Sequence, residues 1–121
     1  MRTLHEVQQE IDTLIKDEWQ SHYWAPLSSL ARLTEEVGEL AREINHSYGE
    51  KPKKSSEGAG SIAAEIGDVL YILASLANSL EIDLDAAFSL VMAKYRQRDA
   101  KRWQPDQASV QNIERNHIAE G

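Results

Sequence analysis

The feature that most constrains the fold is an acid-rich segment, residues 33–40, that also has the apolar spacing of a buried helix. It has the sequence Leu-Thr-Glu-Glu-Val-Gly-Glu-Leu. Glu36 and Glu39 lie three residues apart, so their side chains leave neighbouring turns on the same side of the helix. Apolar residues recur at the spacing of one helical stripe through this segment and its flanks, at Leu30, Leu33, Val37, Leu40 and Ile44. The chain is therefore expected to fold around a helix that carries carboxylates beside its core-facing stripe.

A second acid pair, Glu65 and Asp68, also has a spacing of three residues, and its surroundings are more apolar. Burying an unpaired charge is very costly, so such a carboxylate must be paired, metal-bound or protonated. Acid pairs on solvated helix faces are common, and Glu35 with Glu36, taken alone, would be interpreted as such a pair. Two helices that each offer an acid pair from a bundle interior instead form an oxygen-rich cage, which suits hard divalent cations such as Mg²⁺. The stripe that includes Glu65 is otherwise aliphatic, with Val69, Ile72 and Leu76.

The two acidic segments together resemble the signature of the MazG-type nucleoside triphosphate pyrophosphohydrolases. Glu-Glu-x-x-Glu occupies residues 35–39, and Glu-x-x-Asp follows at 65–68 after 25 intervening residues. The flanking sequences Arg-Leu-Thr at 32–34 and Gly-Asp-Val-Leu at 67–70 also resemble the sequences of that family. The resemblance runs from Leu4 to Trp103. It implies an all-α, four-helix-bundle-like, oligomeric enzyme that converts NTP or dNTP and water to the monophosphate and pyrophosphate, in nucleotide-pool house-cleaning.

This interpretation assigns roles to five carboxylates. Glu36, Glu39, Glu65 and Asp68 are expected to hold Mg²⁺, for which Mn²⁺ can substitute, because a metal must bridge them to the anionic phosphates. Glu35 and Glu36 are the expected catalytic residues, and Glu35 either holds a second ion or orients the attacking water. The base, the sugar and the phosphorus that the water attacks stay open.

Composition narrows the class of partner. The net charge is −7 over 121 residues, which argues against binding a nucleic-acid polymer through its phosphates. No cysteine is present, which excludes disulfides and fits a reducing compartment. No apolar run reaches the roughly 18 residues of a membrane span, and Glu6 lies where a secretory signal would need an apolar run. We therefore expect a cytoplasmic protein without a membrane partner.

The chain is expected to form four main helices in one domain, residues 1–103, followed by a polar, flexible tail, 104–121. The first helix opens at a capping box, Thr3 to Glu6, and fails within 21–24. The second runs from Pro26 to about His46. The third is capped by Ser61 and ends near Leu80, and the fourth follows an N-cap at Asp83. Glycine, proline and serine in residues 47–60 predict a long loop between the two acidic helices.

An aromatic cluster lies where the first helix is expected to end. It contains Trp19, His22, Tyr23 and Trp24. One interpretation is core or interface packing. The other is a stacking wall for a nucleobase, because flat rings bind any base face, and members of the resembled family place aromatics from this region near the base. On this second interpretation Trp19 and Trp24 bind the base.

Two groups of basic residues are candidates for binding phosphate. Lys94 and Arg98 are four residues apart on the fourth helix and stand where the resembled family uses basic residues for this purpose. Cations near a helix C-terminus are also favourable for the helix dipole alone. Lys54 belongs to a lysine run in the loop, which is either solvated or folds over the triphosphate as a lid.

Two other classes of protein compete with this interpretation. A di-iron carboxylate bundle needs Glu-x-x-His on two helices, and the sequence has one such match, Glu43 to His46. A non-catalytic helical oligomerisation module with a carboxylate metal site would bind metal without turnover. A helix apolar on most faces, such as the third, is central in its bundle or covered by a partner subunit. We therefore expect a homo-oligomer, a tetramer or a dimer.

Overall fold

The structure is a computed structural model, and it describes residues 1–49 and 61–99 of the chain. Its order of elements is α1 (Leu4–Asp12), the π-helix η1 (Thr13–Glu18), α2 (Pro26–Tyr48), α3 (Ile62–Ser79) and α4 (Leu84–Asp99). The described residues divide between two units, of which the first contains residues up to 87 and the second begins at residue 88. The described residues contain helices and no strand, so the all-α class is confirmed. The loop segment 50–60 and the tail 104–121 lie outside the described residues.

The helix ends follow from the caps that the sequence predicts. The Thr3 side chain accepts a hydrogen bond from the Glu6 amide while the Glu6 carboxylate accepts one from the Thr3 amide, which is the expected capping box. Pro26 occupies the first turn of α2, where a missing amide proton costs nothing. The Ser61 hydroxyl accepts from the Ala64 amide and caps α3. The predicted starts of these three helices are confirmed.

The first helix differs from the expectation in its last turns. After Asp12 the backbone changes to a π-helix, and the Trp19 amide donates to the Leu14 carbonyl at 2.9 Å. The Ser21 amide donates to the Ile15 carbonyl at 2.8 Å, and Gln20 adopts a left-handed φ of 49°. The helix therefore ends at Glu18, earlier than predicted. Short π-helical turns that continue an α-helix are frequent at functional sites.

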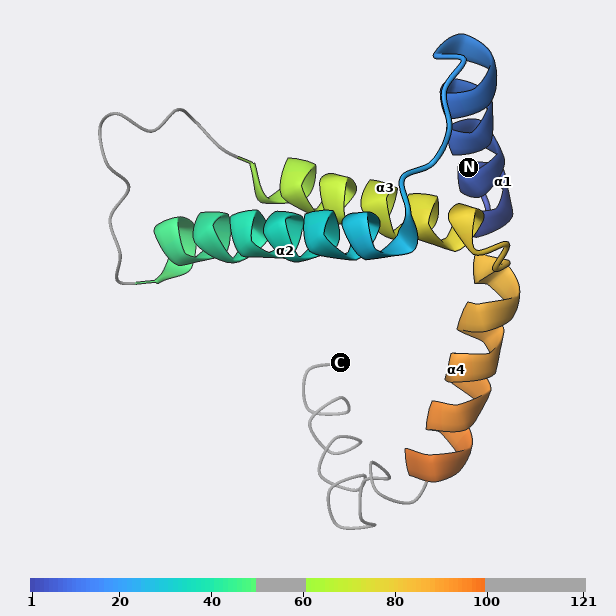
Figure 1. Ribbon diagram of the computed structural model, residues 1–121. Helices are drawn as coiled ribbons and strands as arrows, with labels where there is room; N and C mark the ends of the chain where they lie inside the picture. The colour runs from blue at the N-terminus through green and yellow to red at the C-terminus, as the bar shows by residue number, and fades with distance from the viewer. Residues whose placement is uncertain (50–60, 100–121) are drawn as a thin grey trace. The chain divides into compact units, whose positions relative to one another are not determined.

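Helices α2 and α3 lie side by side and antiparallel (Figure 1), and they form the main helix–helix contact of the first unit. Helix α1 packs on α3. Ile11, Ile15 and Ala74 are the buried centre of this packing. Burial is uneven along α3: its buried residues all lie in its C-terminal half, at Ile72, Ala74, Ser75 and Ala77. The N-terminal half of α3, where the acid pair lies, is the less buried part of the helix.

The end of α3 is a Schellman motif. The Ile82 amide donates to the Ala77 carbonyl at 2.9 Å and the Glu81 amide donates to the Asn78 carbonyl at 3.1 Å. Glu81 takes the left-handed position, with a φ of 56°, that is usually filled by glycine. Asp83 Oδ1 then accepts a hydrogen bond from the Asp85 amide at 3.0 Å. The short connection that the sequence predicts between the third and fourth helices is confirmed.

A buried polar network joins α1 to this corner. Gln8 Nε2 donates to Asn78 Oδ1 and to the Ile82 carbonyl, both at 2.8 Å, and Gln8 Oε1 accepts from the Leu84 amide at 2.9 Å. Asn78 Nδ2 donates to the Tyr23 hydroxyl at 2.9 Å, and that hydroxyl donates to the Asp12 carboxylate. Burial and the Asp12 contact raise the pKa of Tyr23 to about 12. The network therefore fixes the aromatic segment to α1 and α3.

Helix α3 is long and apolar enough to cross a membrane, by its length and composition alone. The core helix of a soluble protein can have the same length and composition, so a single such helix is weak evidence. Helix α3 carries Glu65 and Asp68 and contributes Ala74 to the core of the first unit. These features do not indicate a membrane protein.

Replacing Gln8 by leucine should destabilise the protein. The change leaves the Leu84 amide and the Asn78 side chain without their buried partner, and an unsatisfied buried group costs about 1–3 kcal/mol. We expect the free energy of unfolding, measured by urea titration, to fall by that amount. Gln9→Leu, at an exposed neighbouring position of α1, should stay within about 0.5 kcal/mol of the parent. Equal effects of the two changes would show that the network is not stabilising.

Candidate active site

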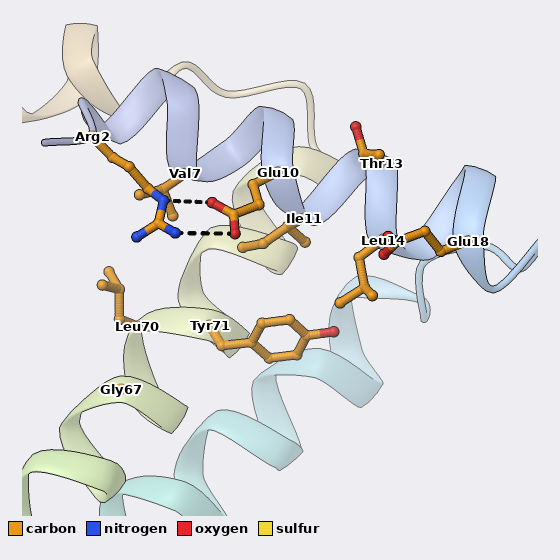
Figure 2. Close-up of a pocket in the computed structure, with 10 residues that line it drawn as sticks. All are labelled: Arg2, Val7, Glu10, Ile11, Thr13, Leu14, Glu18, Gly67, Leu70 and Tyr71. Carbon is orange, nitrogen blue, oxygen red and sulfur yellow. Dashed lines mark hydrogen bonds and ion pairs between the residues drawn. The ribbon is translucent and has the colours of Figure 1, made fainter.

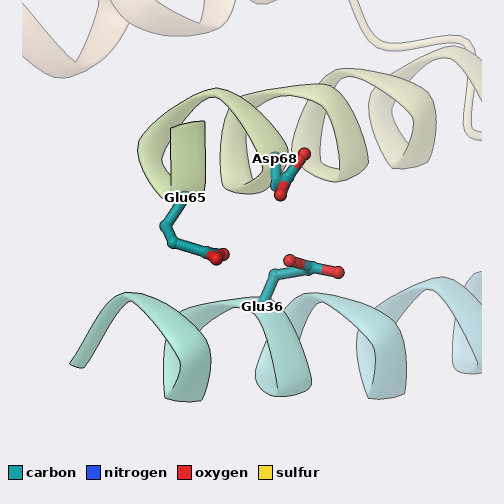
Figure 3. Close-up of side chains that lie close together, drawn as sticks. All are labelled: Glu36, Glu65 and Asp68. Carbon is teal, nitrogen blue, oxygen red and sulfur yellow. The ribbon is translucent and has the colours of Figure 1, made fainter. Parts of the chain in front are cut away.

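Three carboxylates converge between α2 and α3. Glu36 comes from α2, and Glu65 and Asp68 come from the first two turns of α3. Each offers an oxygen atom such that all three atoms lie within 4.8 Å of one another, and Figure 3 shows the three side chains meeting between the two helices. The structure therefore brings together three of the four predicted metal ligands. We call these three residues the acid cluster.

Glu65 contributes a buried carboxylate oxygen to the acid cluster. Its Oε2 atom is buried and, in the described part of the chain, has no hydrogen-bond partner. Burial raises the pKa of this carboxyl, and the negative charges of Asp68, Glu36 and Glu39 raise it further. A buried oxygen without a donor, in a field of negative charge, is a position where a cation would be stabilised.

Glu36 has a protein counter-ion. Arg32 Nε donates to Glu36 Oε1 at 2.9 Å across one turn of α2. The Glu36 side chain is 13% exposed and that of Arg32 is 41% exposed. The ion pair raises the pKa of Arg32, and the charges of Glu35 and Asp68 contribute to this shift. One cationic side chain thus lies against an acid cluster of three negative charges.

The other two predicted carboxylates of α2 lie outside the acid cluster. Glu39, one turn beyond Glu36, is exposed, yet it is close enough for its charge to raise the pKa of Glu65. Glu35 is exposed and acts electrostatically on Arg32. Glu43 and His46, the pair considered for a di-iron site, are not members of the acid cluster. The predicted ligand set is thus concentrated at Glu36, Glu65 and Asp68, with Glu39 beside it.

The acid cluster fits a hard divalent cation better than other metals. Every donor is a carboxylate oxygen, the ligand type that Mg²⁺ and Mn²⁺ prefer. The buried Glu65 Oε2 supplies a donor that is not already used by the described protein. These residues could hold Mg²⁺, which when bound would polarise phosphate oxygens and offset their charge.

An aromatic pocket of about 290 Å³ lies farther along the same two helices. Ser29 and Arg32 line it from α2, and Tyr71, Ile72 and Ser75 line it from α3. Its remaining wall is formed by η1 and the segment between η1 and α2. This wall includes both predicted base-binding residues and consists of Ile15, Trp19, Ser21, His22, Tyr23 and Trp24. Trp19 and Trp24 are 59% and 56% exposed, which contradicts simple core packing for these two side chains in this chain.

The position of this pocket is set by helical periodicity. Asp68, Ile72 and Ser75 have the spacing i, i+4, i+7, so they lie on one side of α3. Glu36, Arg32 and Ser29 have the same spacing in reverse along α2. The antiparallel seam between α2 and α3 therefore carries the acid cluster and, about 10 Å farther along at 1.5 Å per residue, the floor of the aromatic pocket.

A larger groove of about 550 Å³ lies between α1 with η1 and α3. Figure 2 shows Leu70 and Tyr71 of α3 facing Ile11 and Leu14, with the Arg2–Glu10 ion pair at one end. Gly67 and Leu70 are about 140–200° from Glu65 around α3, at 100° per residue. This groove therefore opens on the side of α3 opposite the acid cluster and is not the candidate active site.

The structure describes two of the three predicted phosphate-binding residues. Lys94 and Arg98 are exposed on α4, in the second unit. Arg98 forms an ion pair with Asp99 at 3.1 Å, and both cations lie over the Tyr95 ring. Lys54 lies outside the described residues. The roles of these three residues in binding phosphate stay predictions.

Sequence reasoning missed three groups at the site. Arg32 was noted only as part of the flanking motif, although its i, i+4 spacing to Glu36 is an ion-pair signal. The buried hydroxyl residues Ser29 and Ser75 give no signal without the register of the two helices. The hydrogen bond from Asn78 that anchors the Tyr23 hydroxyl joins residues 55 apart along the chain, so local sequence gives no signal for it.

This combination of an antiparallel helix pair and a carboxylate cluster in its seam agrees with the comparisons with known proteins. The model of the MazG nucleotide pyrophosphohydrolase domain matches residues 25–103, and the chain belongs to this family. Members are typically metal-dependent, and the acid cluster is a suitable metal site. The all-α pyrophosphohydrolase class expected from the sequence is confirmed.

Among individual relatives, the chain is 52% identical over 102 residues to YpjD of Bacillus subtilis, a match that covers 84% of this chain and 91% of YpjD. The crystal structure of the Bacillus subtilis YPJD protein matches with a TM-score of 0.72 and 49% identity, covering 82% of this chain and 98% of that one. A Bacillus-conserved MazG protein, a nucleotide pyrophosphohydrolase, matches with a TM-score of 0.66 and 45% identity, covering 78% and 90%.

The Glu65→Gln variant should no longer be stabilised by added metal as the parent is. Because the pKa of Glu65 is raised in the folded state, the metal-free parent should lose stability as the pH rises from the usual value through the raised one. The neutral glutamine removes this loss, so at pH 7 without metal its Tm should equal or exceed that of the parent. A cation at a hundred times its Kd should stabilise the parent by about 2.7 kcal/mol. The variant should lack most of this gain.

The measurement is a set of melting curves at pH 5 and pH 7, with and without Mg²⁺. Glu18→Gln, an exposed position on η1, is the matched control and should behave as the parent does. If Glu65→Gln keeps the full rise in Tm on adding Mg²⁺, Glu65 is not a ligand.

Proposed function

We propose that the protein is a metal-dependent nucleoside triphosphate pyrophosphohydrolase that acts in nucleotide-pool house-cleaning. The reaction converts NTP or dNTP and water to NMP or dNMP and pyrophosphate. The observation that supports it most strongly is the seam between α2 and α3. There an oxygen-only acid cluster and an aromatic pocket lie along one line, joined by Arg32.

A nucleoside triphosphate is polar at one end and flat and aromatic at the other, and the seam offers a complementary surface to each. Its phosphates would meet the metal at Glu36, Glu65 and Asp68, with Glu39 as the fourth ligand. Mg²⁺, or Mn²⁺ in its place, would supply the charge that links carboxylates to phosphates. Glu35 either holds a second ion or orients the attacking water, and Glu36 also belongs to the catalytic set.

The base would stack in the aromatic pocket. Trp19 and Trp24 are 59% and 56% exposed, and stacking on an aromatic side chain stabilises a bound base by about 1–3 kcal/mol. Tyr23 is held by Asp12 and Asn78, so the segment that carries the two tryptophans is anchored before a nucleotide binds. Anchoring of this kind reduces the ordering that binding must impose.

Lys94, Arg98 and Lys54 are proposed to bind phosphate from α4 and from the segment between α2 and α3. Their cationic side chains suit anionic oxygens. They would supplement the metal in offsetting the negative charge of the phosphates.

The first test is identification of the products. With Mg²⁺ or Mn²⁺, at least one of the common NTPs or dNTPs should give its monophosphate and pyrophosphate in equal amounts. Anion-exchange chromatography of the nucleotides, with a coupled pyrophosphate assay, measures both. Asp68→Asn should lose most of the activity while Asp17→Asn, an exposed site on η1, should keep it. Formation of diphosphate and orthophosphate alone would contradict the proposal.

A homo-oligomer, either a tetramer or a dimer, is also proposed. The buried apolar core of the described residues consists of five side chains, whereas Val37, Ile66 and Leu73 are 42–53% exposed. Exposed apolar faces of this extent favour assembly. We place the protein in the cytoplasm, without a membrane or nucleic-acid polymer as partner.

Light scattering at micromolar concentration should therefore give a mass of about two or four times 13.6 kDa. Leu73→Glu places a charge on the exposed apolar face of α3 and should shift the protein toward smaller species. Glu18→Gln should leave the mass unchanged. A monomer for the parent would contradict the proposal.

A further inference from the structure

Arg32 is the side chain that links the two halves of the candidate site. Its Nε atom donates to Glu36 Oε1 at 2.9 Å, and its guanidinium carbon lies 5.9 Å from the centre of the Trp24 ring. It also lines the aromatic pocket together with Ser29 of the preceding turn. One cation thus contacts a member of the acid cluster on one side and the proposed base wall on the other.

The ion pair with Glu36 competes with a metal. Glu36, Glu65 and Asp68 place three negative charges within 4.8 Å, and an arginine keeps its charge under all ordinary conditions. In the metal-free protein, Arg32 offsets part of this charge. A divalent cation that uses Glu36 must share or displace that partner, and it is repelled by a guanidinium held so close.

Arg32 is the more exposed member of its ion pair with Glu36. Its side chain is 41% exposed, whereas that of Glu36 is 13% exposed, so the arginine is the member of the pair that is free to turn. The long aliphatic stem and planar head allow it to follow an anion while staying over the Trp24 ring. The junction between acid cluster and aromatic pocket is where the phosphate nearest the sugar would lie if the base occupies the pocket.

We propose that Arg32 is an exchanging counter-ion: it holds Glu36 in the metal-free protein and transfers to the nucleotide phosphate nearest the sugar when metal occupies the acid cluster. This inference rests on the proposed function. In this role Arg32 weakens the binding of metal alone and strengthens the binding of nucleotide. The two effects have opposite signs, which distinguishes an exchanging counter-ion from a residue that only positions Glu36.

The test measures metal and nucleotide separately. Isothermal titration calorimetry with Mg²⁺ or Mn²⁺ alone is applied to the parent, Arg32→Gln and Arg32→Met. The methionine variant keeps an apolar stem against Trp24 if glutamine disturbs the local fold. Both variants are expected to bind the metal about three- to tenfold more tightly, because a repelling charge is removed. With saturating metal, the KM for nucleotide is expected to rise about tenfold or more, because a charge-assisted contact is lost.

The matched control is Arg2→Gln. Arg2 forms an ion pair with Glu10 at 2.6 Å on α1, away from the acid cluster, so its loss should change neither the metal Kd nor the KM. Arg32→Lys, which keeps the charge, should leave metal binding near that of the parent.

Each outcome has a distinct meaning. Weaker or unchanged metal binding by both Arg32→Gln and Arg32→Met would overturn the exchange, and so would an unchanged KM. These results would leave the proposed function intact as long as the parent binds metal and releases pyrophosphate. A parent that binds no Mg²⁺ or Mn²⁺ and hydrolyses no nucleotide would overturn the proposed function and the exchange together.

Discussion

Repulsion among carboxylates in the seam between α2 and α3 is the constraint on which the site depends. Glu36, Glu65 and Asp68 offer oxygens within 4.8 Å, and burial deprives Glu65 Oε2 of water without supplying a donor in the described part of the chain. Such an arrangement is unfavourable unless a proton, a guanidinium or a metal offsets the charge. In the metal-free protein Arg32 pairs with Glu36, whereas burial and the neighbouring negative charges raise the pKa of Glu65.

The fold separates this unfavourable region from the region that stabilises the first unit. Helix α3 has its buried residues in its C-terminal half, where Ala74 meets Ile11 and Ile15 of the α1–η1 segment. The network of Gln8 and Asn78 lies at the same end. The acid pair lies in the opposite half of α3. The repulsion among the carboxylates therefore acts away from the residues that hold α1 on α3.

Local sequence determines much of this architecture, and tertiary packing determines the rest. The capping box at Thr3 and the cap at Ser61 are contained within one turn each, so the helix starts could be predicted. Spacing along single helices also placed Glu36 on α2 and the acid pair on α3. The π-helix before Trp19 could not be predicted, because residues 13–18 contain no glycine, proline or other signal that distinguishes a π-helix from an α-helix. The aromatic pocket needed the register between α2 and α3, which apolar spacing alone does not give.

The same register explains why the acids and the pocket form one surface. Ser29 lies seven residues before Glu36 on α2, and Ser75 lies seven residues after Asp68 on α3. Two antiparallel helices that bring Glu36 opposite Asp68 must therefore also bring Ser29 near Ser75. The π-turn and the Tyr23 hydroxyl then fix where the aromatic segment covers that end of the seam. Charge at one end and flat rings at the other thus follow from one helix pairing. Arg32, four residues from Glu36 and three from Ser29, lies by the same periodicity at the junction between them.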